Sequence, residues 1–213
     1  MISVLMPSRG RPALCDTARK SARDMATDEI EILVYVDDDD PQKGKYKDVI
    51  IGPPLHSGKA IKHLSTLAKG DLMFFGCDDF VWKTPGWDRI FAEKMPEYGL
   101  SVLFPRDQKG ANKSITPCFS KRWIEVTGLY PDEFSHFGPD TWVIDTARKA
   151  GTLISVQEVL ITHTKVKDDT FNRARGGGDA SFAKKLLDDK AGERQQIANK
   201  IKELCTHTPA VAQ

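Results

Sequence analysis

The sequence predicts an α/β fold with a mainly parallel sheet that is covered by helices on both faces. Short apolar segments typical of strands alternate along the chain with amphipathic patterns typical of helices, and this alternation is characteristic of βαβ units. Glycines stand where several of the expected helices should end. A chain of 213 residues is long enough to form one domain with a substantial core.

The strand-like segments cover residues 2–6, 31–36, 49–51, 72–75, 101–104, 115–119 and 153–160. The patterns between them predict helices at residues 12–25, 59–68, 86–95, 121–126 and 140–150. Proline opens the first of these helices, which is a favoured place for it. A polar stretch and three glycines (176–178) then precede a last expected helix at residues 180–204.

Composition restricts the class of protein. The 31 Lys and Arg residues nearly balance the 30 Asp and Glu residues, which argues against a protein that coats nucleic acid along its whole surface. The four cysteines have no paired spacing, so we expect neither a disulfide framework nor a zinc site. The first strand lacks the basic start of a signal peptide, and no apolar run is long enough to span a membrane. We therefore expect a soluble, cytoplasmic protein without a membrane partner.

Two adjacent carboxylates, Asp78 and Asp79, directly follow the apolar segment 72–75. This position places them at the carboxyl edge of the sheet, where open α/β folds bind their ligands. Neighbouring carboxylates repel each other unless a cation or a donor lies between them. Oxygen ligands of this kind suit Mg²⁺ or Mn²⁺ that also holds a substrate phosphate. The alternative is a solvated turn that caps the next helix.

Two further loops lie at the same expected edge. The loop 7–12 contains Arg9 and Arg11, which can stack on a base or bind phosphate oxygens, although both can equally be ordinary surface arginines. Four aspartates follow the second strand. Of these, Asp37 and Asp38 are placed to accept hydrogen bonds from a nucleobase or a ribose, whereas we expect Asp39 and Asp40 to be solvated.

Three other residues are candidates for chemistry. The segment 52–60 is not a phosphate-binding P-loop, because five residues separate its glycines and Ala60 offers no hydroxyl for magnesium. Lys59 remains a candidate phosphate contact. Asp140 opens a helix, where it can either cap the helix or serve as a general base. His163 ends the last strand, where a structural role and metal ligation are both open.

Taken in order, these motifs resemble the GT-A glycosyltransferases, in particular the large inverting family 2. The resemblance covers about residues 2–163. It rests on Pro-Ser-Arg after the first strand, Asp-Asp after the second and Ala-Lys-Gly-Asp before the fourth, followed by Cys-Asp-Asp. It continues with Gly-Pro-Asp at residues 138–140 and Arg-Lys-Ala-Gly at residues 148–151. Gly76 departs from the family pattern, because many relatives have an acidic residue at its position, and Pro139 stands where many relatives have Glu.

The resemblance implies transfer of a sugar, with inversion, from a nucleoside-diphosphate donor, expected to be a UDP-sugar such as UDP-glucose, to an acceptor hydroxyl. It implies Mn²⁺ or Mg²⁺ as cofactor and Asp140 as the general base. The implied metal ligands are Asp78, Asp79 and His163. The implied donor-binding residues are Pro7, Ser8, Arg9, Arg11, Asp37, Asp38, Lys59 and Asp78. The domain expected to carry them spans residues 1–163, and residues 164–213 are expected to form a helical lid that belongs to the same domain and excludes water.

The residues after the last strand bear on the acceptor. Residues 163–202 contain ten Lys or Arg against six Asp or Glu, a surplus that can contact phosphates of a polynucleotide or form a solvated face. The cluster comprises Lys165, Lys167, Arg173 and Arg175. The Pro-Ser-Arg-Gly-Arg-Pro loop at residues 7–12 and the Asp-Asp-Asp-Asp-Pro run at residues 37–41 resemble those of compact phage-encoded relatives, some of which glucosylate hydroxymethylpyrimidines in DNA. Such an origin would place the protein in the host cytoplasm. Modified DNA is therefore one expected acceptor and a small saccharide is the other.

Two other functions are compatible with these motifs. A nucleotidyltransferase has a similar sheet and similar metal-binding carboxylates, but it normally has a glycine-rich first loop with a lysine, and Ser-Arg-Gly-Arg matches that pattern poorly. A non-catalytic module that binds nucleotide sugars or DNA is the second alternative. Such a module would not need a general base at Asp140.

Overall fold

The fold is a mixed α/β structure, described here from a computed structural model of the chain. The structure describes residues 1–107, 116–164 and 179–206. The strands are β1 (Ile2–Ser8), β2 (Glu31–Asp37), β3 (Ile50–Gly52), β4 (Leu72–Phe75), β5 (Phe80–Trp82), β6 (Val102–Arg106), β7 (Cys118–Ser120) and β8 (Leu153–His163). The helices are α1 (Pro12–Met25), η1 (Lys43–Lys45), α2 (Ser57–Leu67), α3 (Trp87–Lys94), α4 (Lys121–Thr127), α5 (Pro139–Ala150), α7 (Asp179–Asp189) and α8 (Ala191–Thr206).

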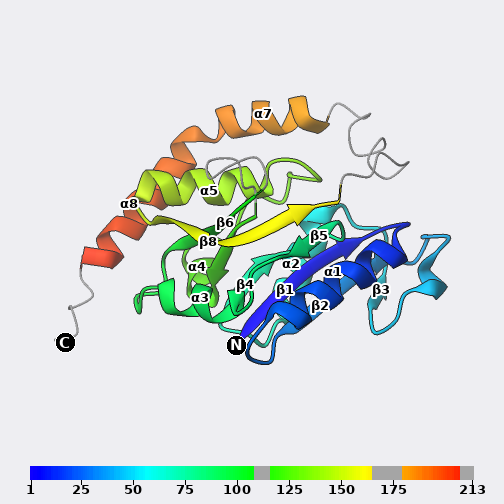
Figure 1. Cartoon of the computed structure of the whole chain (residues 1–213). Helices are drawn as coiled ribbons and strands as arrows, with labels where there is room; N and C mark the ends of the chain where they lie inside the picture. The colour runs from blue at the N-terminus through cyan, green and yellow to red at the C-terminus, as the bar shows by residue number, and fades with distance from the viewer. Residues whose placement is uncertain (108–115, 165–178, 207–213) are drawn as a thin grey trace.

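Within the described residues, the strands form one curled sheet of eight in the order β3-β2-β1-β4-β7-β6-β8-β5 (Figure 1). The first four strands run parallel, as the alternation of strands and helices predicts. Strand β7 is antiparallel to both of its neighbours, and β5 is antiparallel to β8. The carboxyl ends of β1, β2 and β4 therefore lie at one edge of the sheet, which is the edge where the predicted ligand-binding loops begin.

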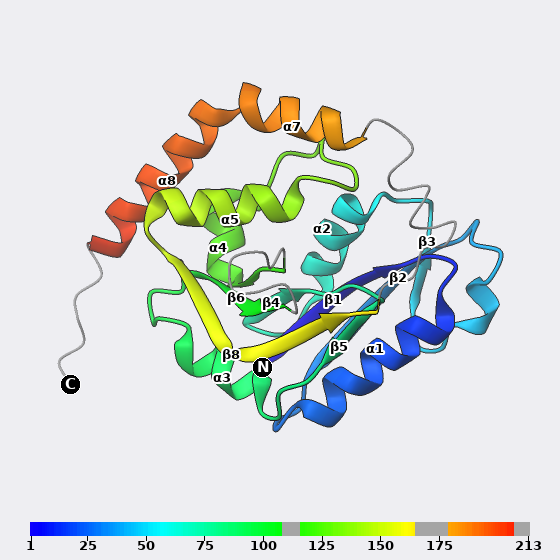
Figure 2. The ribbon, with the colours of Figure 1, turned by 45° about the horizontal axis from the view of Figure 1, so that its top comes forward.

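Each face of the sheet has its own apolar core. Val4 and Met6 pack on the face that α1 and α3 cover, whereas Leu5 packs on the face that α2, α4, α5 and α8 cover. Successive side chains along a strand point to opposite faces, so every central strand contributes to both cores. Figure 2 shows α1 on one side of the sheet and α5 with α7 and α8 on the other. The prediction of helices on both faces is confirmed.

Two expected elements differ in the structure. Strand β5 follows Asp79 immediately, where the sequence suggested only a turn, and it pairs with the end of β8. The single helix expected at residues 180–204 divides at Lys190 into α7 and α8. The division lets Ala183 of α7 cover the start of α5 while Ala198 of α8 packs in the core beneath. Among the described residues, no helix combines the length and the apolar character that a membrane span requires.

Candidate functional site

The loop between β1 and α1 holds Asp78 at the carboxyl edge of the sheet. The Ser8 hydroxyl donates to Asp78 Oδ2 at 2.8 Å, and Arg11 donates to Asp78 Oδ1 at 3.2 Å. Asp78 is only 6% exposed. Burial raises the pKa of this carboxyl to about 6, although the Ser8 hydrogen bond and the Arg11 charge oppose the shift. The structure therefore brings the first loop together with Asp78, the first member of the Asp-Asp pair.

Arg9 extends from the same loop toward the end of β2. Its guanidinium donates to Asp37 Oδ2 at 2.8 Å and also pairs with Asp39. The second oxygen of Asp37 accepts the Leu55 N–H at 2.9 Å, so this carboxylate links the β1 loop to the segment after β3. Asp38 is exposed beside it. Pro7 and Ser8 are the last residues of β1 and carry this loop.

Asp40 is not solvated, contrary to our expectation. It is 1% exposed, and its carboxylate accepts the Gly10 N–H at 2.7 Å and the Gln42 N–H at 2.8 Å. The bond to Gln42 forms an Asx turn at Asp40-Pro41, a sequence in which such a turn is common. Tyr46 supports the same loop, since its hydroxyl lies 3.1 Å from Ser8 Oγ and accepts the Arg11 N–H at 2.8 Å. No sequence pattern marked Tyr46 for this role.

The pairing of β5 with β8 brings Asp79 and His163 together. Phe80 is opposite His163 in this antiparallel pair, and the Thr164 N–H donates to the Asp79 carbonyl at 2.7 Å. The His163 Nδ1 atom consequently lies 3.6 Å from Asp79 Oδ1. The edge of the imidazole packs against the Phe80 ring, with 4.6 Å between ring centres. Both the main chain and the ring contact therefore fix this carboxylate–imidazole pair.

Asp79 and His163 fit an open metal site better than a closed one. Among the residues that the structure describes, no group of three or more His, Cys, Asp or Glu side chains is arranged to hold a metal. The Asp78 carboxylate is bonded to Ser8 and Arg11, whereas Asp79 faces His163. Mg²⁺ and Mn²⁺ are commonly held by one or two protein ligands together with substrate phosphates and water. The partly exposed Asp79 and His163 side chains suit that mode of binding.

Asp140 lies in the first turn of α5 and is not its cap. Gly138 is the N-cap residue and Pro139 begins the helix, which corrects the expected start by one residue. The Asp140 carboxylate is half-buried and accepts the Thr141 N–H at 2.7 Å. Burial raises the pKa of Asp140 above its usual range, while the hydrogen bonds from Thr141 oppose the shift.

The thiol of Cys77 connects Asp140 with the Asp-Asp pair. Burial is the largest cause of the raised pKa of Cys77, followed by the charges of Asp79, Asp78 and Asp140. The charges of all three carboxylates therefore reach the same thiol. Because its pKa is raised, the thiol stays protonated at neutral pH and is a poor nucleophile. The candidate base and the candidate metal ligand are thus both near enough to this thiol for their charges to raise its pKa.

The space around Gly76 explains why this sequence lacks an acidic residue there. A Cβ atom at Gly76 would lie 2.7 Å from a methyl group of Val4 and 3.3 Å from the Leu5 carbonyl oxygen. Any side chain would be forced into the neighbouring strand β1. The acidic motif is therefore limited by packing to Asp78 and Asp79.

Other candidate residues are not placed in this cluster. Lys59 is exposed in the first turn of α2. Its charge acts on Asp132, whose pKa is lowered mainly by Lys62 and to a lesser degree by Lys59. The four basic residues of the proposed acceptor cluster lie outside the described residues. Those residues are Lys165, Lys167, Arg173 and Arg175.

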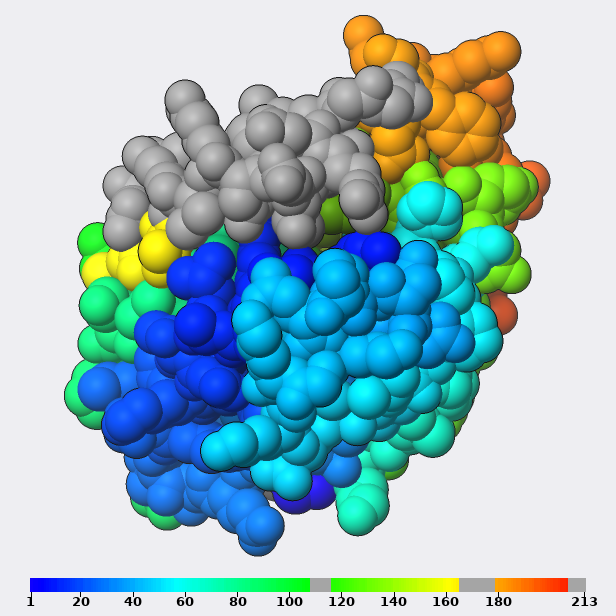
Figure 3. Space-filling model, turned by 90° about the vertical axis from the view of Figure 1, so that its right-hand side faces the viewer, coloured from blue at the N-terminus to red at the C-terminus, as the bar shows by residue number. Residues whose placement is uncertain are grey.

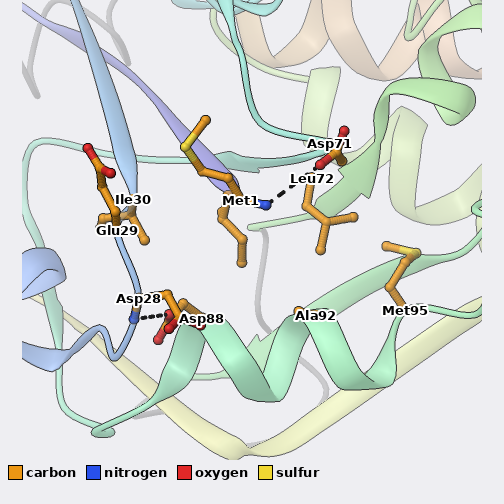
Figure 4. Close-up of a pocket in the computed structure, with 10 residues that line it drawn as sticks. Met1, Asp28, Glu29, Ile30, Asp71, Leu72, Asp88, Ala92 and Met95 are labelled. Atoms are coloured by element: carbon orange, nitrogen blue, oxygen red, sulfur yellow. Dashed lines mark hydrogen bonds and ion pairs between the residues drawn. The ribbon is translucent and has the colours of Figure 1, made fainter.

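A hollow of about 530 Å³ lies at the opposite, amino edge of the sheet, between β1, β4 and α3 (Figure 4). Its aspartates are engaged in structural contacts. Asp88 accepts the N–H groups of Thr27 and Asp28 at 2.8 Å each, and Asp71 lies 3.6 Å from the amino group of Met1. The residues that line this hollow include acidic side chains but no Lys or Arg, unlike the loops at the carboxyl edge, where Arg9 and Arg11 pair with carboxylates.

We expect Asp78→Asn to stabilise the protein above about pH 6. The folded state raises the pKa of Asp78 from 3.8 to about 6, so it binds this proton more tightly than the unfolded state. The resulting stabilisation is complete below the unfolded pKa and is lost as the pH rises through the folded pKa. Removing the charge should recover at most about 3 kcal/mol, since one pKa unit corresponds to about 1.4 kcal/mol. Thermal melts at about pH 4 and pH 7.5 test this, because the gain should vanish at the lower pH. A lower melting temperature at both values would contradict it.

Comparison with known proteins identifies the fold. No family model matches the sequence, and no curated protein matches it. Among solved structures, the chain is similar to the mannosyltransferase PcManGT from Pyrobaculum calidifontis, solved with GDP-Man and Mn²⁺. The two chains are 12% identical over 95% of this chain and 69% of that chain, with a TM-score of 0.65.

Two further structures show the same likeness. Glucosyl-3-phosphoglycerate synthase from Mycobacterium tuberculosis, solved with Mn²⁺, UDP and phosphoglyceric acid, is 14% identical over 99% of this chain and 80% of its own, with a TM-score of 0.58. TarS residues 1–349 from S. aureus, solved with UDP, are 15% identical over 81% of this chain, with a TM-score of 0.57. This chain spans 62% of that TarS fragment. The chain described here therefore has the GT-A type of α/β fold, as its motifs predict.

Proposed function

We propose that the protein is a metal-dependent glycosyltransferase, which transfers a sugar from a nucleoside-diphosphate donor to an acceptor hydroxyl with inversion at the anomeric carbon. The observation that carries this proposal is the pairing of Asp79 with His163 at the carboxyl edge of a GT-A type sheet, where His163 Nδ1 is 3.6 Å from Asp79 Oδ1. The charges of Asp79 and Asp140 both help to raise the pKa of the Cys77 thiol, behind the larger effect of burial. The likeness to structures solved with UDP or GDP-Man supports a nucleotide-sugar donor.

The two adjacent aspartates have different proposed roles. Asp79 and His163 would hold Mn²⁺ or Mg²⁺, which would neutralise the charge of the diphosphate leaving group. Asp78 belongs with the donor side, because Ser8 and Arg11 hold it against the first loop. Asp78 precedes Asp79 directly in the chain, so a metal held by Asp79 would also attract the Asp78 carboxylate.

Arg9, Arg11 and Asp37 are the proposed contacts to the nucleotide. Both guanidinium groups lie at the carboxyl edge, held by carboxylates of the site, and a guanidinium can form two parallel hydrogen bonds with phosphate oxygens. Asp37 is fixed by Arg9 and by the Leu55 N–H, so its position does not depend on the ligand. Pro7, Ser8, Asp38 and Lys59 complete the proposed donor-binding set. We propose a UDP-sugar as the donor.

Asp140 is the proposed general base. It would take the proton from the acceptor hydroxyl as the oxygen attacks the sugar, a role that requires a carboxylate within hydrogen-bond reach of that hydroxyl. Partial burial raises its pKa, which makes it a stronger base than an ordinary aspartate. Its Oδ1 atom accepts the Thr141 N–H at 2.7 Å and the Thr141 hydroxyl at 3.4 Å, so this oxygen is oriented by the first turn of α5.

We propose a hydroxymethylpyrimidine in DNA as the acceptor, with a small saccharide as the alternative. The support for DNA is the surplus of basic residues in 163–202 and the resemblance to compact phage-encoded relatives. A polynucleotide acceptor would be bound through its phosphates, so its affinity should fall steeply with added salt. Replacing two of the four basic residues between Lys165 and Arg175 by Ala should reduce that salt dependence.

The test is to incubate the protein with UDP-glucose, Mn²⁺ and DNA with or without hydroxymethylpyrimidines, and then to weigh the nucleosides by mass spectrometry. Addition of a hexose to the modified base alone is the expected result. A nucleotide adduct on the acceptor would instead identify a nucleotidyltransferase. If no DNA gains a hexose while UDP is released with saccharide acceptors, glycosyl transfer stands and DNA is removed as the acceptor. If no donor sugar is transferred to any acceptor, the proposed function is wrong.

A further inference from the structure

The turn that leads into Asp140 is held by the first residue of the C-terminal helices. Asp179 begins α7, and its carboxylate accepts hydrogen bonds from three groups of the segment 135–137. The Ser135 hydroxyl donates to Oδ1, and the N–H groups of His136 and Phe137 donate to Oδ2 at 3.1 and 3.3 Å. These contacts join residues more than 40 positions apart in the sequence.

The same helix also covers the residue at which the turn becomes α5. Gly138 has a φ of 101°, and a Cβ atom placed there would meet the Phe134 ring at 2.4 Å and the Ala183 methyl group at 3.3 Å. Ala183 lies one turn after Asp179 on α7. Figure 3 shows α7, in orange, seated on the yellow-green segment that leads into α5. Helix α7 therefore bonds to the segment 135–137 and limits the space for a side chain at Gly138.

The other side of the turn is fixed by the start of α2. The Gly58 N–H donates to the Ser135 carbonyl at 2.7 Å, and Ser57 Oγ lies 2.8 Å from Nδ1 of His136. Residues 135–137 thus lie between the first turn of α2 and the first turn of α7. Three residues after Phe137 the chain reaches Asp140, whose backbone position is set by where this turn ends.

We propose that Asp179 is a positioning residue for Asp140, an inference that rests on the proposed function of Asp140 as the general base. Asp179 makes no contact with Asp140 among the described interactions, and it acts by fixing the turn 135–138 on which the base is carried. Hydrogen bonds to a charged carboxylate are stronger than those to neutral groups. Displacing a catalytic group by about 1 Å can cost on the order of 10²-fold in rate.

The expected effect of Asp179→Ala is a 10- to 100-fold fall in kcat, on the order of the cost of a misplaced catalytic group, with donor affinity unchanged. The amide protons of His136 and Phe137 should exchange faster with solvent, because they lose their acceptor. Asp188→Ala is the matched control, since Asp188 is exposed on the same helix. That variant should change neither kcat nor amide exchange. Ser135→Ala removes one of the three donors from the other side and should have a smaller effect of the same kind.

A double variant separates positioning from an independent role. If Asp179 acts through Asp140, adding Asp179→Ala to an Asp140→Asn protein should leave the remaining rate unchanged. A further fall of the same size as in the wild-type background would overturn the proposal, as would a wild-type kcat for Asp179→Ala with accelerated amide exchange. If the wild-type protein transfers sugar and Asp179→Ala does not, the result bears on the role of Asp179 and leaves the proposed function of the site in place. Absence of transfer in the wild type would overturn the function of the site, and the role of Asp179 with it.

Discussion

Sugar transfer by the Asp140→Asn variant is expected to be slower by on the order of 10²-fold or more, the scale of losing a general base. The amide keeps the size of the carboxyl group and can still accept the Thr141 N–H. It cannot take a proton from the acceptor hydroxyl. Donor binding should therefore stay at the wild-type level, as calorimetric titration with the nucleotide would measure. Transfer at the wild-type rate would show that Asp140 serves only the first turn of α5.

The pH dependence of the wild-type rate provides a second test of Asp140 as the general base. Asp140 must be ionised to accept a proton, and burial raises its pKa. The rate should therefore begin to fall, as the pH is lowered, at a higher pH than an ordinary aspartate would give. The Asn variant should lose this limb of the profile.

Asp79→Ala is expected to abolish the metal-dependent part of nucleotide binding. The variant removes the carboxylate that faces His163 and leaves Asp78 with its own partners, Ser8 and Arg11. Asp71→Ala is the matched control, because Asp71 lies just before the same strand β4, at the opposite edge of the sheet, and its side chain is 85% exposed. Titrations of UDP with and without Mn²⁺ should show no metal effect for the Asp79 variant and a normal one for the control. An undiminished metal effect in Asp79→Ala would assign the metal to other residues.

Much of the fold was predictable because local patterns and distant packing agree. The bounds of α1 match the prediction, since Pro12 favours the first turn and buried residues recur with the helical period through Ala22. The parallel strands β1, β2 and β4 were recognisable as short apolar runs that both faces of the sheet bury.

The parts that the sequence did not predict depend on contacts between distant residues. Strand β5 has three residues, and its partner lies about 80 positions later in β8, so no local pattern distinguishes it from a turn. No local pattern places His163 beside Asp79, and only the family resemblance implied that the two residues share a metal; the pairing of β5 with β8 brings them together. The burial of Asp40 likewise depends on the Gly10 N–H, which lies 30 positions earlier.

The sequence alone could not assign different roles to Asp78 and Asp79, because both are aspartates and suit the same chemistry. The structure points their carboxylates to different partners, as consecutive residues at the end of a strand tend to do. Asp78 faces the first loop and Asp79 faces the end of β8. Asp179 was not a candidate at all, since its partners in the turn 135–137 are known only from the packing of α7.

Nucleotide binding in the presence of metal tests the central claim most directly. The melting temperature of the protein should be measured with millimolar UDP, GDP and other nucleoside diphosphates, each with Mn²⁺ and in metal-free buffer. A ligand that binds only the folded state stabilises it by about 2.7 kcal/mol at 100 times its Kd. We expect UDP with Mn²⁺ to raise the melting temperature, and UDP without metal to raise it much less. If no nucleoside diphosphate raises it in the presence of Mn²⁺ or Mg²⁺, the carboxyl edge of this sheet is not a donor site.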